Sequence, residues 1–205
     1  MMVARLFLRS RRAGWTALYI AAIAVLTAAL HFALRQGDQD YLATPEGSPT
    51  ALVLVFVPLA AALLIGVGSY GPFGEVERTA SRPLPPLRLG HLAGLLVLAA
   101  AGLALLALTW DGGAQTFLRN LAGLTGLALI AVPLTGARLS WVLPFSYGIL
   151  AYWVGSAASG EPRLWVWPMR PEDDGAAIAI ALALLAAGLL VSTVIGSRDG
   201  SVEAE

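Results

Sequence analysis

Cysteine and lysine are both missing from this chain of 205 residues, and charged residues of either sign are scarce. The lack of cysteine excludes disulfide bonds and thiolate metal sites. Because all 13 basic residues are arginine, the lysine-containing phosphate-binding loop of many ATPases is excluded as well. This chain therefore does not hydrolyse nucleotide through that motif itself.

Charged residues make up 13% of the chain and hydrophobic residues 58%, whereas typical globular domains are about 25% charged. So few charges cannot cover the surface of a soluble fold. The net charge of zero gives no indication of a nucleic-acid partner. Apolar runs of about 20 residues, the length that crosses a hydrocarbon core, recur along the chain. We therefore expect an all-α, multi-pass protein integral to the cell membrane.

Six apolar segments have the length of membrane-spanning helices, and we assign them to one transmembrane domain over residues 1–196. These segments are residues 15–34, 50–70, 91–110, 120–136, 139–158 and 176–195. The main connecting loops are predicted over residues 71–90 and 159–175. A short turn over residues 111–113 leads through Arg119 and Asn120 into the fourth segment. Residues 197–205 are predicted to form a disordered tail.

Arginine is distributed unevenly between the two sides that six spans define. Nine arginines fall on the side of both termini and four on the other side. The positive-inside rule therefore places both termini and residues 71–90 in the cytoplasm, and residues 159–175 outside the cell.

The basic N-terminus has three interpretations. Arg5, Arg9 and Arg12 share one face of a short amphipathic helix, whose guanidinium groups would meet anionic headgroups at the membrane interface. In the second interpretation these arginines are only the positive flank of the first span. The third is a cleaved signal peptide.

Features within and beside the spans bear on helix packing. Pro58 removes one backbone hydrogen bond from the second span, and a neighbouring helix can compensate for that loss. Small residues four positions apart predict close helix contact. Such pairs are Ala24/Ala28, Ala177/Ala181 and Ala183/Ala187. The run from Glu172 to Asp174 is predicted to start the last helix, because negative charge favours a helix N-terminus.

No pattern indicates catalysis or ion coupling. The His-Glu-x-x-His and Gly-x-Ser-x-Gly motifs are absent, and the central part of each predicted span lacks Asp, Glu and Arg, unlike a proton or sodium relay. His31 and His91 lie near span ends on opposite sides, so they cannot share a metal ion. We expect no catalytic residue, no metal and no cofactor in this chain, which is then not an enzyme.

The outer tryptophans have two open interpretations. Trp153, Trp165 and Trp167 fall near the outer end of the fifth span and in the following loop. They could line a substrate path, or they could belong to the aromatic belt at the membrane interface.

The loop over residues 71–90 begins with the sequence GPFGEVERTASRPLPPLR. Pro72 suits the first turn of a short helix, and Glu75 to Thr79 can continue it. Pro83, Pro85 and Pro86 then stop the helix and stiffen the return to the membrane. This loop is either a docking surface or a charged connector whose arginines hold the orientation.

The stretch from Glu75 to Leu89 resembles the cytoplasmic loop of permease subunits of type-2 ATP-binding-cassette exporters. In that family an acidic residue, a Thr- or Ser-bearing stretch and a basic residue form a coupling helix against the ATPase. The resemblance implies a separate ATPase subunit that holds ATP and Mg²⁺, and a second permease subunit in a homo- or heterodimer. It implies coupling contacts at Glu75, Glu77, Arg78, Thr79 and Arg82.

The function implied by this resemblance is export of an amphipathic compound by alternating access across the lipid bilayer. The three prolines and the short chain depart from the usual family pattern. The alternative is a non-transporting membrane scaffold or sensor accessory protein that uses the same loop to bind a partner without ATP. An intramembrane enzyme is the third option.

Overall fold

The computed structural model describes residue 19 and residues 49–69, 85–108, 113–136, 139–157 and 162–194. Within these ranges the chain is helical and forms no strand, which confirms the all-α class for this part. The elements are α3 (Pro49–Gly68), α5 (Pro85–Ala107), α6 (Ala114–Thr135), α7 (Val142–Ser156), the 3₁₀ helix η2 (Leu164–Met169) and α8 (Gly175–Val194).

Three of these helices, α5, α6 and α8, are long and apolar enough to cross a membrane. The apolar part of α3, Leu52–Gly68, is shorter. Helix α7 has 15 residues and extends over about 22 Å, less than the hydrocarbon thickness of about 30 Å. Of the predicted first span only Tyr19 is described, and it is helical; the predicted tail lies outside the described residues.

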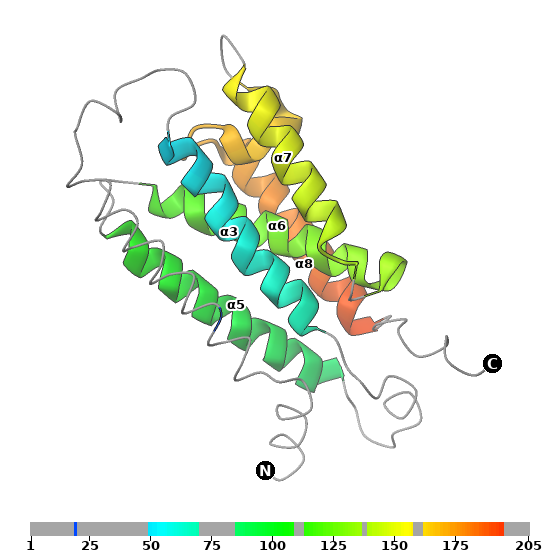
Figure 1. Cartoon of the computed structure of the whole chain (residues 1–205). Helices are drawn as coiled ribbons and strands as arrows, with labels where there is room; N and C mark the ends of the chain where they lie inside the picture. The colour runs from blue at the N-terminus through cyan, green and yellow to red at the C-terminus, as the bar shows by residue number, and fades with distance from the viewer. Residues whose placement is uncertain are drawn as a thin grey trace.

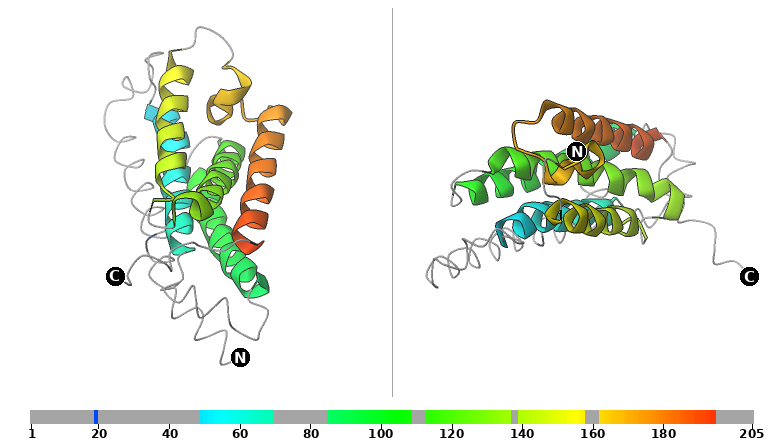
Figure 2. Two further views of the ribbon diagram at one scale, coloured as in Figure 1. Left: turned by 90° about the vertical axis from the view of Figure 1, so that its right-hand side faces the viewer. Right: turned by 90° about the horizontal axis from the view of Figure 1, so that it is seen from above.

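Successive described helices run in alternating directions (Figure 1). We call the end where α3, α6 and α8 begin, and where η2 lies, the upper end. The end where α5 and α7 begin is the lower end. Figure 2 shows α6 between a layer formed by α3 and α7 and a layer formed by α8, and the most extensive helix contacts are those of α6 with α8 and with α3. Helix α6 is therefore the centre of the described structure.

Buried apolar side chains fill the space on both sides of α6. One cluster joins α3, α5 and α6 and includes Ile65, Leu103, Phe117 and Leu121. A second cluster joins α3, α6, η2 and α8 and includes Leu59, Leu124, Trp167 and Ala181. Between helices in lipid, such contacts stabilise through close packing rather than through removal of apolar surface from water.

Two glycines bring the backbones of α6 and α8 into direct contact. A Cβ atom on Gly126 would lie 2.3 Å from the carbonyl carbon and oxygen of Leu184. A Cβ atom on Gly188 would lie 2.5 Å from the carbonyl oxygen of Gly126. Only glycine fits at these two positions of the α6–α8 contact.

The alanine pairs predicted on α8 have different surroundings. Ala177 and Ala181 are buried on the face that includes Gly188, so the first pair lies in the helix contact. Ala183 and Ala187 are exposed. Spacing alone could not distinguish the two pairs, because both have the same interval.

Two helices begin six residues before the predicted start of a span. Helix α5 begins at Pro85, inside the segment predicted as loop, because proline is compatible with the first turn of a helix. Helix α6 begins at Ala114 after Gly113, whose φ of 86° is a left-handed conformation that glycine adopts easily. As a result Arg119 lies within α6 rather than before it, and Asn120 lies in the second turn of α6 rather than at its start.

Candidate functional site

The predicted coupling and membrane-interface residues lie outside the described part of the chain. They are Glu75, Glu77, Arg78, Thr79 and Arg82 of the loop, and Arg5, Arg9 and Arg12 of the N-terminus. Their roles stay predictions. The described residues do show the two helix ends between which the loop is inserted.

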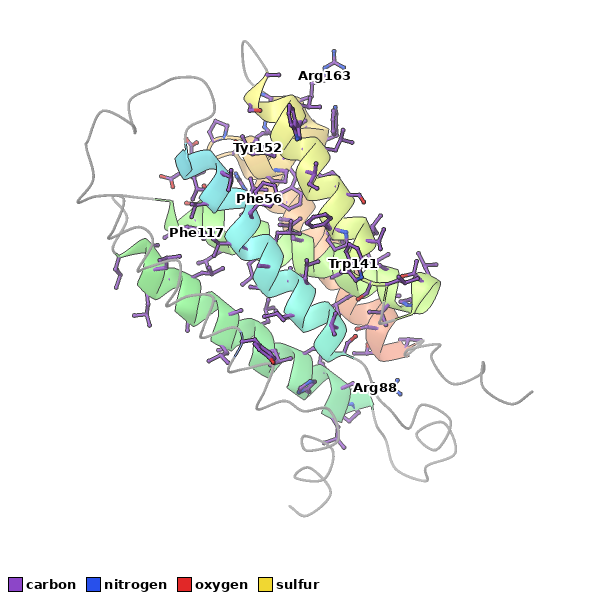
Figure 3. All side chains as sticks on the ribbon, viewed as in Figure 1. Phe56, Arg88, Phe117, Trp141, Tyr152 and Arg163 are labelled. Carbon is purple, nitrogen blue, oxygen red and sulfur yellow. The ribbon has the colours of Figure 1, made fainter. Side chains whose placement is uncertain are left out.

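The end of α3 and the start of α5 are held together at the lower end. The Nε2 atom of His91 lies 3.3 Å from the carbonyl oxygen of Gly68, and His91 is buried. Ser69 donates its hydroxyl proton to the carbonyl oxygen of Gly66 at 2.6 Å, which satisfies one carbonyl of the last turn of α3. Arg88, in the first turn of α5, lies at the same end (Figure 3). The intervening segment therefore leaves and re-enters the bundle at adjacent points.

At the upper end, Arg119 of α6 is buried with only 4% of its surface exposed. Its Nη1 donates to the carbonyl oxygen of Pro171 at 2.6 Å. Its Nη2 donates to the carbonyl oxygens of Arg170 at 2.9 Å and Pro168 at 3.3 Å. One guanidinium group thus satisfies three carbonyls of the irregular segment 162–174, whose backbone lacks the continuous hydrogen bonding of a long helix.

The neighbouring Asn120 is fully buried and joins three elements through one amide. Its Nδ2 donates to the carbonyl oxygen of Pro168 at 3.0 Å and to that of Leu54, in α3, at 2.9 Å. Its Oδ1 accepts a hydrogen bond from Nε of Arg119 at 3.3 Å.

The bond to Leu54 has a simple cause in the sequence. In an α-helix the carbonyl of residue 54 accepts the N–H of residue 58, and Pro58 has no N–H to donate. The Asn120 amide supplies the missing donor. The prediction that a neighbouring helix compensates for Pro58 is therefore confirmed, and the compensating residue is identified.

The three predicted tryptophans lie in different surroundings. Trp167 is buried, stacks on Tyr147 with ring centroids 6.1 Å apart, and packs against Gly123, where a Cβ atom would lie 2.3 Å from the indole. Trp153 and Trp165 are exposed, as an aromatic belt requires. Trp167 is instead part of the interior and anchors η2 between α6 and α7.

The same segment leads into α8 through a capped helix start. Asp174 accepts a hydrogen bond from the backbone N–H of Ala176 at 2.9 Å and forms an ion pair with Arg170. The Arg170 side chain also donates to the carbonyl oxygen of Pro162. The hydrogen bond from Arg170, followed by those from the α8 N-terminus, lowers the pKa of Asp174. The prediction that this acidic run starts the last helix is confirmed at Asp174.

The side chains of the upper-end cluster hold a backbone segment in place. The guanidinium of Arg119 is directed at backbone carbonyls, and the Asn120 amide is used on both its nitrogen and its oxygen. Within the described ranges, no group of three or more His, Asp or Glu residues is placed to hold a metal ion. Figure 3 shows Arg163 pointing away from this end of the bundle.

Sequence reasoning missed the roles of Arg119 and Asn120. A signal was available, because an Arg-Asn pair directly before an apolar run can belong to the helix, and Pro58 requires a donor from another element. Neither observation identifies the other partner from sequence alone.

No protein-family model, no curated protein and no solved structure matches this chain.

Proposed function

We propose that this chain is the membrane-spanning permease subunit of an ATP-binding-cassette exporter, with six spans, both termini in the cytoplasm and a separate ATPase partner. Residues 71–90 are the coupling segment, and a second permease subunit completes the transporter. The observation that carries the proposal is the junction at the lower end, where His91 meets the carbonyl of Gly68 at 3.3 Å. Force applied to a short segment between these anchored ends would act on α3 and α5 together.

The exposed surface supports the membrane part of the proposal. Large apolar side chains are exposed on helices α5, α7 and α8. Examples are Val97, Leu105, Leu150, Trp153, Leu182 and Leu190. Extended apolar surface of this kind is unfavourable in water and suits contact with lipid tails.

The proposed orientation rests on the arginines of the whole sequence, with nine on the side of both termini and four on the other side. Arg119, Arg163 and Arg170 lie toward the upper end, and Arg88 lies at the lower end. The lower end is also the end from which the segment with Arg78 and Arg82 emerges. With six spans, the lower end is on the side of the nine arginines of the full sequence, and we therefore propose it as the cytoplasmic end.

The first test is purification of the full chain from its native membrane in mild detergent, with identification of bound proteins. We expect an ATPase subunit to copurify, and the variant Glu77→Gln/Arg78→Gln to lose it while inserting normally into the membrane. The matched control is Glu172→Gln/Asp173→Asn, which changes exposed carboxylates at the upper end and should retain the ATPase.

A preparation without ATPase, under conditions that preserve other membrane complexes, would contradict the exporter proposal and favour the scaffold. Equal ATPase binding by the wild type and the Glu77/Arg78 variant would remove the coupling role of the segment.

A further inference from the structure

The Asn120 amide lies where three elements depend on one side chain. Its nitrogen binds Leu54 of α3 and Pro168 of η2, at 2.9 Å and 3.0 Å, and its oxygen binds Arg119 of α6. The side chain is fully buried, so water cannot replace these hydrogen bonds without opening the packing. A displacement of either carbonyl must therefore break a bond or move the amide.

The α3 side of this junction is a weak point of the helix. The missing N–H of Pro58 leaves the α3 backbone without one internal bond at Leu54, and that carbonyl bonds to α6 instead. Helices bend most easily at such positions. A change in the bend of α3 at Pro58 therefore moves the Leu54 carbonyl and alters its hydrogen bond to Asn120.

On the η2 side, the junction holds the segment 162–174, whose only helix is the short 3₁₀ helix η2. Residues 162–174 are held by the carbonyl contacts of Arg119 and Asn120, by the packing of Trp167 against Gly123, and by the hydrogen bond that Tyr147 donates to the carbonyl of Trp165. Of these contacts, those of the Asn120 amide also reach α3.

We propose that Asn120 is a positioning residue that transmits movement of α3 at Pro58 to the upper-end segment 162–174. In the packed state the amide holds Pro168 in place while α3 leaves the Leu54 carbonyl free to accept. When the bend of α3 at Pro58 changes, the Asn120 amide loses its hydrogen bond to the Leu54 carbonyl, and the segment 162–174 loosens. This step rests on the proposed function: in an exporter, the same link would connect the cytoplasmic coupling segment, which follows α3, to a gate at the outer end of the transport path.

The test uses a chain that has no cysteine, so that one introduced thiol reports alone. Val166 of η2 is buried with 1% of its surface exposed, and Val166→Cys changes little volume. The rate at which a maleimide labels this thiol, in the full chain purified in detergent, measures how often the segment opens. The measurement needs no ATPase, so it remains informative if the exporter proposal fails.

Four chains are compared in this background: the parent, Asn120→Asp, Pro58→Ala and the double variant. Asn120→Asp keeps an acceptor for Arg119 but cannot donate to Leu54 or Pro168. We expect the thiol to be labelled about tenfold faster, which corresponds to the net loss of one to two hydrogen bonds. Pro58→Ala restores the helical N–H that bonds to the Leu54 carbonyl. Because this N–H displaces the Asn120 amide, we expect the thiol to be labelled severalfold faster, although the substitution is in α3 and not in the labelled segment.

The decisive result is the double variant. If the effect of Pro58→Ala passes through Asn120, then the double variant labels no faster than Asn120→Asp alone. Multiplied rates would show two independent effects and would overturn the proposal. So would an unchanged labelling rate in either single variant.

Matched controls separate the link from general damage to helices. Pro133→Ala removes the proline inside α6, and Thr125→Val removes a buried hydroxyl of α6 that has no hydrogen-bond partner. Both should leave the labelling rate unchanged. An increase in the Pro133→Ala chain equal to that of Pro58→Ala would also refute the transmission through Asn120.

Discussion

Replacement of Gly126 by alanine is expected to destabilise the protein by forcing α6 and α8 apart. The new Cβ atom would lie 2.3 Å from backbone atoms of Leu184 and 2.5 Å from the backbone nitrogen of Leu185. These are backbone atoms of a helix, so a change of side-chain rotamer cannot relieve the contact. The two helices must recede by about 1 Å to reach an ordinary van der Waals distance.

The expected magnitude follows from two opposing terms. Overpacking of this kind costs about 1–3 kcal/mol, and the change from glycine to alanine within a helix recovers about 0.5–1 kcal/mol. We therefore expect a net loss of up to about 2.5 kcal/mol in the free energy of unfolding. Gly94→Ala is the matched control, because this glycine of α5 has nothing within 4 Å of its added Cβ, and it should be neutral or slightly stabilising.

The assay is reversible unfolding of the full chain in mixed micelles, followed by far-ultraviolet circular dichroism as the denaturing detergent fraction rises. Equal midpoints for Gly126→Ala and Gly94→Ala would refute the close α6–α8 contact. Gly188→Ala tests the same contact from α8, since its Cβ would lie 2.5 Å from the Gly126 carbonyl oxygen. The two substitutions together should cost less than their sum, because the first already separates the helices.

The same unfolding assay checks three further expectations at the upper end. Gly123→Ala places a Cβ 2.3 Å from the indole of Trp167, and the same two terms give a net cost of up to about 2.5 kcal/mol. Arg119→Met keeps the apolar stem but removes the donors to three carbonyls, so we expect a loss of at least about 2 kcal/mol, with Arg119→Lys between it and the wild type. The hydrogen bond from Arg170 lowers the pKa of Asp174, so its contribution is present above the ordinary aspartate pKa of about 3.9 and is lost as the pH falls below it. Asp174→Asn should therefore reduce the difference in unfolding midpoint between about pH 5 and pH 3, and an unchanged pH dependence would contradict the ion pair.

Length and apolar composition were sufficient to predict the class and several element positions. Helix α8, Gly175–Val194, lies within one residue of the predicted span 176–195, because an uninterrupted apolar run leaves few alternatives. The first residues of α5 and α6 were harder to predict from the sequence. Pro85 and Gly113 are typical of both loops and first turns, and only the backbone geometry decides between these positions.

Residues that act between elements were harder to predict than the elements themselves. Trp165 and Trp167 are two positions apart in one loop, yet the first is exposed and the second fills the space above Gly123. Composition treats the two alike, because burial depends on which face of η2 meets α6. The same limit applies to the alanine pairs of α8, which have one spacing and two surroundings.

Pro58 shows that a missing backbone N–H in one helix can predict that a contact with another element exists, but not which residue makes it. The sequence states that one carbonyl in α3 lacks its helical donor, and in a low-dielectric interior such a group must find a partner. It does not identify the residue that supplies the donor, since Asn120 is 62 positions away and was expected at the start of the fourth span. The missing hydrogen bond in α3, the early start of α6 and the fixed position of Pro168 are therefore consequences of one arrangement. A search for unpaired backbone groups at helix-interior prolines, followed by a search for buried amides beside them, would identify this kind of junction in other helical membrane proteins.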